Sequence, residues 1–207
     1  MINLLELKPF VIKNVLSEEE YSYVYDCVNK GFPEEIKPDL PSDNREYPEY
    51  LNVPDLGYLA YIKGFSEDFK KSIKNTLENS LGIPLSLPDI HFARYTSKTG
   101  HKPTLKPHYD IGVRHPSVTI SIQMDTTLDW DLHAYDGSAT LSKNEAMVFS
   151  GSHQVHWRPP KDFSEDDYFD IMVCQLAVSD EILSEDHAEY MSIINAAAGA
   201  DYSARYM

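Results

Sequence analysis

The sequence predicts a mainly β domain with flanking helices, and three observations support this fold class. From Ile90 onward, short segments rich in β-branched and aromatic residues follow one another, separated by turn signals such as Asp136-Gly137 and Lys143-Asn144. Closely spaced strands of this kind are typical of an antiparallel sandwich or barrel. Before Ile90, two segments have helical periodicity and recognisable caps. The chain of 207 residues, 42% of them hydrophobic, suits one domain.

The part of the chain before Ile90 is expected to contain two strands and two helices. The segments 7–14 and 57–64 have the composition of short strands. The first helix is expected to begin after Ser17, where Glu20 completes a capping box, and to end at Gly31. The second is expected to begin after Ser66 and to end at Gly82.

Residues 32–56, between the first helix and the second strand, are expected to form a loop. Five of the 13 prolines lie there among acidic residues and tyrosines. A long loop inside a compact domain either has a function, such as covering a substrate, or is disordered. The sequence does not decide between these alternatives.

Seven segments after residue 89 are expected to be strands, and the tail is expected to end in a helix over 184–199. The strand segments are IHFARYT, LKPHYDI, SVTISIQMD, DWDLHAY, EAMVFSG, HQVHWRP and YFDIMVCQLAV.

Charge and composition exclude several classes of partner. The formal net charge of −15 opposes binding to a nucleic-acid backbone or an anionic membrane, because both would repel the protein. The N-terminus has no secretion-signal pattern, and no stretch approaches the about 18 apolar residues of a membrane span. Cys27 and Cys174 form no metal-type or redox-type pair. These observations favour a cytoplasmic protein and leave its oligomeric state open.

A His-x-acid motif at His108-Tyr109-Asp110 is the first candidate for a metal site. The chain has two such motifs, and the other is His187-Ala188-Glu189. Side chains two residues apart point to the same face of a strand, but they diverge on a helix. His108 and Asp110 lie in a strand-like context and can reach one ion, whereas the second motif lies in a helical stretch and cannot.

A third ligand is expected from the far end of the strand series. His156 is preferred and His153 is the rival. Two histidines and one carboxylate that leave open positions are the expected ligand set of non-haem Fe(II). The alternative is that these histidines simply fill a β core.

The order of several motifs resembles the 2-oxoglutarate/Fe(II) dioxygenases, particularly their prolyl-4-hydroxylase-like branch. KPFVIKNVLSEEEY resembles the opening strand and helix of that branch. RYTSKTGHKPTLKPHYD resembles a tyrosine-bearing strand, a turn and the His-x-Asp ligands. LDWDLHAYDGSATLSKNEAMVFSG, followed by HQVHWRPP, resembles the hairpin and strand that lead to the distal histidine.

This resemblance implies a double-stranded β-helix core (jelly-roll, cupin-like) over residues 90–178. Residues 1–89 would supply the helices, loop and supporting strands of the same single domain, and residues 179–207 a C-terminal helix. The resemblance also implies that His108, Asp110 and His156 bind Fe(II), with 2-oxoglutarate and O₂ as co-substrates. Tyr95 matches a position that often contacts the co-substrate carboxylate.

The implied reaction couples oxidative decarboxylation of 2-oxoglutarate to hydroxylation of an amino acid, a peptide or a related small molecule. Asp110 favours hydroxylation over halogenation, because the halogenases that resemble this family lack that carboxylate and bind chloride there. Two other functions stay open: a cupin-like metalloprotein that does not use 2-oxoglutarate, and a non-catalytic jelly-roll binding module.

The sequence departs from the family pattern at the anchor for the far carboxylate of 2-oxoglutarate. The family usually has Arg or Lys about ten residues after the distal histidine, but residues 163–169 are acidic here. Arg158 is the expected substitute, because on a continuing strand it faces the same way as His156. Lys106 and Lys161 are weaker candidates. Alternatively, Arg158 forms an ion pair with the acidic run 165–167.

Overall fold

The computed structural model describes residues 4, 6–37, 47–110, 117–135 and 137–178, which form two helices, 11 strands and two short 3₁₀ turns. The helices are α1 (Glu18–Gly31) and α2 (Glu67–Leu81), and the 3₁₀ turns are Pro54–Leu56 and Ser97–Thr99. The strands are β1 (Phe10–Lys13), β2 (Tyr50–Val53), β3 (Tyr58–Tyr61), β4 (Asp89–Thr96), β5 (Leu105–His108), β6 (Ser117–Thr126), β7 (Leu132–Ala134), β8 (Gly137–Ala139), β9 (Glu145–Phe149), β10 (His156–Arg158) and β11 (Tyr168–Ala177).

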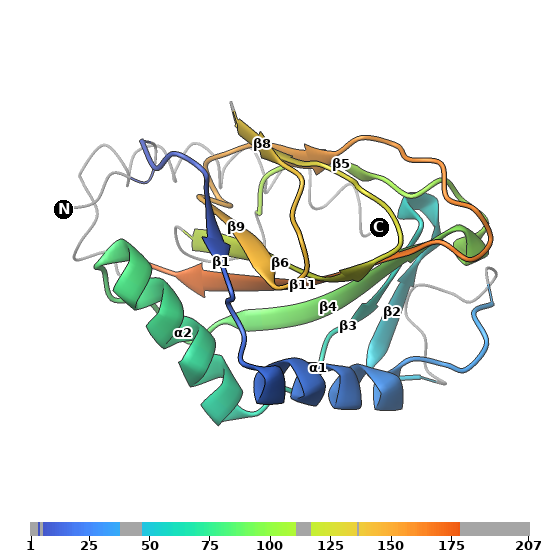
Figure 1. Cartoon of the computed structure of the whole chain (residues 1–207), viewed down its shortest axis with the longest axis horizontal. Helices are drawn as coiled ribbons and strands as arrows, with labels where there is room; N and C mark the ends of the chain where they lie inside the picture. The colour runs from blue at the N-terminus through green and yellow to red at the C-terminus, as the bar shows by residue number, and fades with distance from the viewer. Residues whose placement is uncertain (1–3, 5, 38–46, 111–116, 136, 179–207) are drawn as a thin grey trace, which may run out of the picture.

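The strands form two sheets that do not close into a barrel. The larger sheet has the order β1-β9-β6-β11-β4-β3-β2 and the smaller one β5-β10-β7-β8, and every pairing is antiparallel. Figure 1 shows α1 and α2 on the face of the larger sheet that is turned away from the smaller sheet. The predicted mainly β fold with a jelly-roll core and flanking helices is confirmed.

Both helices begin and end where the sequence predicts. Ser17 and Glu20 form the capping box of α1, and Ser66 caps α2. Gly82 ends α2 in the left-handed conformation, which glycine adopts without strain. Gly31, the last residue of α1, meets a different requirement: a Cβ there would lie 1.9 Å from the ring of Tyr61.

The main hydrophobic core lies between the helices and the larger sheet. It combines one face of each helix with alternate residues of the central strands, among them Val24, Val28, Phe69, Ile73, Leu77, Phe92, Ile120, Ile122, Met172 and Cys174. Since neighbouring strand residues point to opposite faces, the residues between these point toward the smaller sheet. The strand alternation thus places His91, Ala93 and Tyr95 of β4 in the space between the sheets.

The prediction of a loop over residues 32–56 is wrong for the last part of this segment. Tyr50–Val53 forms strand β2, which pairs with β3 at the edge of the larger sheet. Prolines at 48 and 54 bracket this strand without interrupting it, as edge strands allow. The short strand β8 was not expected from composition; it begins at Gly137 and pairs with β7, in agreement with the hairpin that the family resemblance implies. Residues 38–46 and the tail helix expected over 184–199 lie outside the described residues.

Among the described residues, no helix has the length and apolar character that a membrane span requires.

Candidate metal centre

The smaller sheet brings two of the predicted ligands face to face. His108 ends β5, His156 begins β10, and the antiparallel pairing of these strands sets the two residues opposite each other. Their ring centroids are 4.1 Å apart. Asp110 lies two residues beyond His108, where its backbone N–H donates a 2.9 Å hydrogen bond to the carbonyl of Gly151. Residues about 50 positions apart in sequence therefore meet at one point.

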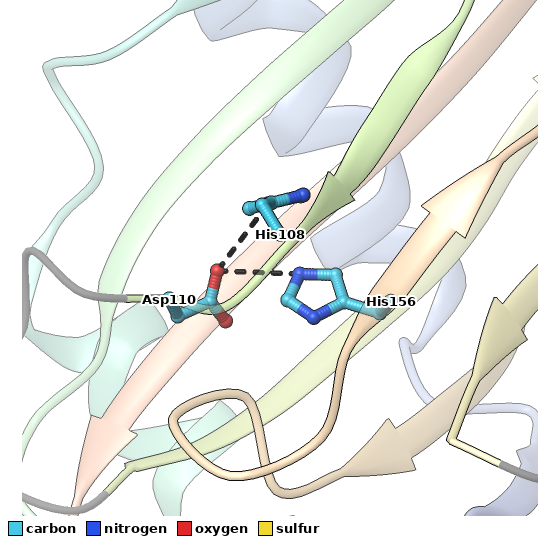
Figure 2. Close-up of side chains that lie close together, drawn as sticks. All are labelled: His108, Asp110 and His156. Atoms are coloured by element: carbon cyan, nitrogen blue, oxygen red, sulfur yellow. Dashed lines mark ion pairs between the residues drawn. The ribbon is translucent and has the colours of Figure 1, made fainter. Parts of the chain in front are cut away.

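The three side chains converge, as Figure 2 shows. Asp110 Oδ1 lies 3.3 Å from His156 Nε2 and 3.8 Å from His108 Nε2. One ligand atom from each residue lies within 4.8 Å of the other two, and this is the only such group of three or more His, Cys, Asp or Glu side chains in the described part of the chain. Asp110 and His156 are buried, whereas the side chain of His108 is 33% exposed, so the cluster is reached from the His108 side.

Hydrogen bonds on the far side of each imidazole decide which nitrogen faces the cluster. His108 Nδ1 lies 2.8 Å from the carbonyl of Lys106, and His156 Nδ1 lies 3.0 Å from the carbonyl of Gln154. A carbonyl can only accept, so each Nδ1 carries the proton and each Nε2 presents a lone pair. Two imidazole lone pairs and a carboxylate oxygen then face one point, where they require a proton or a cation.

Asp110 is held in its ionised form. Burial alone would raise the pKa of its carboxyl. When a proton lies between Asp110 and His156 Nε2, the resulting hydrogen bond and imidazolium charge, together with the hydroxyl of Thr119, outweigh burial and lower the pKa to about 2. Gly151 makes room for this arrangement, since a Cβ there would lie 2.1 Å from both Asp110 Oδ2 and Thr119 Oγ1. The carboxylate is therefore oriented by an outer layer of contacts, as metal-binding carboxylates are.

His153, the rival third ligand, is not part of the cluster. Its Nδ1 lies 2.8 Å from Ser150 Oγ and 2.9 Å from Ser152 Oγ in a buried turn between β9 and β10. Of the two candidates, the structure brings only His156 to His108 and Asp110.

A cavity of about 210 Å³ between the two sheets contains the cluster. Its wall comes from both sheets and consists of Tyr58, His91, Ala93, Tyr95, Leu105, His108, Asp110, Thr119, Ser121, Leu132, Phe149, His156, Arg158, Ile171, Val173 and Gln175. A cavity of this size can hold a small organic acid beside a metal ion.

Arg158 lies at one end of this cavity and faces the same way as His156, as the sequence predicts. The residue is 1% exposed, and its guanidinium lies over the rings of Phe169 and Trp130, at 4.7 and 5.5 Å from their centroids. Nη1 donates to the carbonyl of Trp130, but within the described residues Nε and Nη2 are buried without a hydrogen-bond partner.

The charge of Arg158 therefore has no carboxylate in ion-pair contact with it among the described residues. No ion pair joins it to the acidic run 165–167, which was the alternative expectation, or to any other described carboxylate. Burial lowers the pKa of Arg158 to about 10. Phe169 lies at the start of β11, the last core strand, where the family resemblance leads one to expect a cation. Arg158 brings its charge to that place from the opposite sheet.

The other predicted co-substrate residues differ in their positions. Tyr95 lines the cavity and packs edge-on against Trp130, with ring centroids 5.0 Å apart. Lys106 does not line the cavity and is exposed, because β5 bulges opposite β10: His156 pairs with His108, but Arg158 pairs with Leu105. Lys161 is also absent from the cavity wall.

Sequence reasoning missed the polar residues of the larger sheet that line the cavity: His91, Thr119, Ser121 and Gln175. Each lies on a strand at an even spacing from another cavity residue, for example His91 from Tyr95. Starting from Tyr95, this alternation predicts that His91 lies on the same face of the strand.

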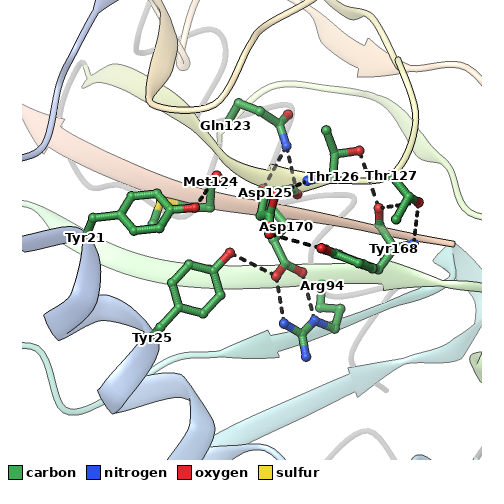
Figure 3. Close-up of polar contacts among 10 residues, drawn as sticks. All are labelled: Tyr21, Tyr25, Arg94, Gln123, Met124, Asp125, Thr126, Thr127, Tyr168 and Asp170. Carbon is green, nitrogen blue, oxygen red and sulfur yellow. Dashed lines mark hydrogen bonds and ion pairs between the residues drawn. The ribbon is translucent and has the colours of Figure 1, made fainter. Parts of the chain in front are cut away.

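A polar network supports the other face of the larger sheet, behind the cavity (Figure 3). Arg94 of β4 donates two hydrogen bonds, of 2.8 and 2.7 Å, to the carboxylate of Asp170 in β11, and Tyr25 of α1 donates to the same carboxylate. Burial raises the pKa of Asp170 even though Arg94 lowers it. This network ties α1 to the strands that form the cavity floor.

Comparisons with known proteins find similarity in the fold of this chain but no match to its sequence. No family model matches it, and no curated protein matches it. Among solved structures, a prolyl-4-hydroxylase from Pseudomonas putida is 12% identical, with a TM-score of 0.55 over 85% of this chain and 95% of that chain. A viral collagen prolyl hydroxylase from Paramecium Bursaria Chlorella virus-1, in a 2-oxoglutarate complex, is 13% identical, with a TM-score of 0.52 over 85% of this chain and 99% of that chain.

A third similar structure is an α-ketoglutarate-dependent epimerase, SnoN, from nogalamycin biosynthesis. It is 12% identical, with a TM-score of 0.55 over 82% of this chain and 77% of that chain. The chain therefore has the fold of the Fe(II)/2-oxoglutarate oxygenases, with prolyl hydroxylases among its structural neighbours.

Proposed function

We propose that this protein is an Fe(II)- and 2-oxoglutarate-dependent oxygenase whose iron is held by His108, Asp110 and His156. The observation that carries the proposal is the convergence of two imidazole lone pairs and one carboxylate oxygen on a single point in a cavity. Hydrogen bonds that both Nδ1 atoms donate to backbone carbonyls, and one that Asp110 accepts from Thr119, orient these ligands in advance. Two histidines and one carboxylate leave three coordination positions open, as Fe(II) oxygenases require.

Arg158 would bind the far carboxylate of 2-oxoglutarate. Its two unpartnered nitrogens can donate parallel hydrogen bonds to one carboxylate, and its buried charge gains a counter-ion. Along β10, Arg158 lies two residues and about 7 Å from His156, a span that the five-carbon diacid can bridge. Tyr95 and the aromatic residues around it would exclude water from this end.

When bound, the iron would supply the oxidative chemistry that turns 2-oxoglutarate, O₂ and a C–H bond into succinate, CO₂ and an alcohol. The residues of this chain would hold the co-substrate at Arg158, keep Asp110 ionised and leave the rest of the cavity for the substrate. We propose hydroxylation of an amino acid, a peptide or a related small molecule as the outcome. The epimerase among the structural neighbours has the same fold with a different product, so the fold does not select the reaction.

One alternative function is a metalloprotein that does not use 2-oxoglutarate, and it would explain the missing cation at the usual position of the carboxylate anchor. Arg158 removes that reason, because it lines the same cavity as the candidate ligands. The alternative of a binding module with structural histidines is disfavoured because both Nε2 atoms face the carboxylate of Asp110 in a cavity.

Anaerobic titration of the protein with Fe(II) and 2-oxoglutarate tests the proposal. A weak visible charge-transfer band at one iron per chain is expected in the wild-type protein and not in Asp110→Ala, and air should then yield succinate. Metal uptake without a band would favour the metalloprotein without 2-oxoglutarate. No metal uptake, together with unchanged stability of His108→Ala, would favour the binding module.

A further inference from the structure

Three uncharged polar side chains face the cavity without a partner in the part of the chain that the structure describes. His91 of β4, Ser121 of β6 and Gln175 of β11 line the cavity, and within the described residues none of them makes a hydrogen bond or an ion pair. Polar groups turned toward an interior space are normally hydrogen-bonded, either to the protein or to a ligand or water. This group, which we call the polar end, needs partners that the described residues do not provide.

The polar end is separate from the proposed 2-oxoglutarate site. His91, Val173 and Ser121 lie in one row across the larger sheet, whereas Tyr95 and Phe169 form a row four residues away along β4, about 13 Å distant. Arg158 lies over Phe169, at the far row.

The metal cluster lies nearer to the polar end. Gln175 pairs with Thr119, and the hydroxyl of Thr119 donates to Asp110. A molecule bound at His91, Ser121 and Gln175 would therefore lie beside the metal ligands, on the side away from Arg158.

The charges of the cavity wall limit what can bind there. Among the described wall residues, Arg158 is the only Arg or Lys and Asp110 is the only Asp or Glu. If the proposed function holds, both are in use, Arg158 by 2-oxoglutarate and Asp110 by iron. His91 adds no cation, because burial lowers the pKa of its imidazole. None of the wall residues that the structure describes offers a further counter-charge to a free carboxylate or ammonium group at this end, so such a group would enter at a large desolvation cost.

We infer that the substrate presents an uncharged group that both donates and accepts hydrogen bonds, namely a carboxamide or peptide group, to His91, Ser121 and Gln175. The side-chain amide of Gln175 offers one donor and one acceptor side, so it pairs with another amide through two reciprocal hydrogen bonds. Ser121 and neutral His91 can each donate or accept. This inference rests on the proposed function and favours a peptide or an amide over a free amino acid as the substrate.

The test compares matched probes on the iron-loaded protein. Each common amino acid is supplied both as the free zwitterion and as its N-acetyl carboxamide, with 2-oxoglutarate and air. The readouts are succinate formed above the probe-free rate and the gain of one oxygen atom by the probe. Gln175→Met removes the amide at nearly constant shape, and His91→Leu removes the imidazole. His101→Leu is the matched control, since His101 is exposed and does not line the cavity.

At least one N-acetyl carboxamide is expected to stimulate succinate formation by about tenfold more than its free form. Gln175→Met and His91→Leu should each lower kcat/KM for that probe by about tenfold, while the dissociation constant of 2-oxoglutarate, read from the charge-transfer band, changes by less than about twofold. His101→Leu should match the wild-type protein.

Stimulation by free amino acids alone, unchanged kcat/KM in both variants, or a normal charge-transfer band with no stimulation by any carboxamide would each overturn the inference and leave the proposed function standing. Absence of the band would instead remove the proposed function, and the inference with it.

Discussion

Replacing Arg158 with Met removes the cation from one end of the cavity and keeps an unbranched apolar side chain. In the folded protein, burial lowers the pKa of Arg158 from its usual range to about 10, which corresponds to a free energy of about 3 kcal/mol against the charged form. The cation keeps contacts with two aromatic rings and one carbonyl, but two of its nitrogens are unpartnered. A buried cation with free donors is what a carboxylate-binding site requires.

The expected loss of affinity follows from those two nitrogens. Each charge-assisted hydrogen bond to a carboxylate contributes about 1.5–3 kcal/mol, so two of them contribute about 3–6 kcal/mol. Arg158→Met should therefore raise the dissociation constant of 2-oxoglutarate by about 10²–10⁴-fold. The free energy of unfolding without ligand should change by less than about 1 kcal/mol, because relief of the buried charge offsets the lost ring and carbonyl contacts.

The assay is anaerobic titration of the iron-loaded protein with 2-oxoglutarate, together with urea unfolding of the metal-free protein. Lys106→Met is the control, since Lys106 is exposed outside the cavity, and it should leave the dissociation constant unchanged. A change of less than about threefold in Arg158→Met would refute the assignment of Arg158 as the co-substrate anchor.

Further perturbations test the parts of the structure around the cluster. Gly151→Ala should displace the carboxylate of Asp110 and weaken metal binding by about 10–100-fold in calorimetry, whereas Gly137→Ala, whose Cβ would meet nothing closer than 3.7 Å, should bind metal normally. Arg94→Met should lower the free energy of unfolding by about 3–5 kcal/mol, because it leaves a buried carboxylate unpaired, and a loss below about 1 kcal/mol would contradict this reading. Its control, Lys74→Met, breaks a more exposed helix pair and should cost less than about 1 kcal/mol in the same urea experiment. Since burial lowers the folded-state pKa of His91, its neutral form is favoured, and the wild-type protein should lose stability relative to His91→Leu as the pH falls from about 7 to 5; a constant difference would count against this.

Two members of the cluster could be predicted from the sequence because their signal is local. His108 and Asp110 are two residues apart beside a strand, and the caps at Ser17 and Ser66 fix both helices from a few neighbouring residues. The same local reasoning predicted that Arg158 faces the same way as His156, which the structure confirms.

Features that depend on pairing between distant strands could not be predicted. The bulge that turns Lys106 outward exists only because β5 pairs with β10. The polar end joins His91, Ser121 and Gln175 through the order β6-β11-β4, which no single segment encodes. Strand β2 was hidden by its flanking prolines, because its edge position, which tolerates them, is a property of the whole sheet.

The most direct test of the central claim is a crystal structure of the protein grown anaerobically with Fe(II), with anomalous scattering recorded at the iron edge. One peak is expected per chain, in contact with His108 Nε2, Asp110 Oδ1 and His156 Nε2. A peak bound elsewhere, or no peak in fully iron-equilibrated crystals, would contradict the account.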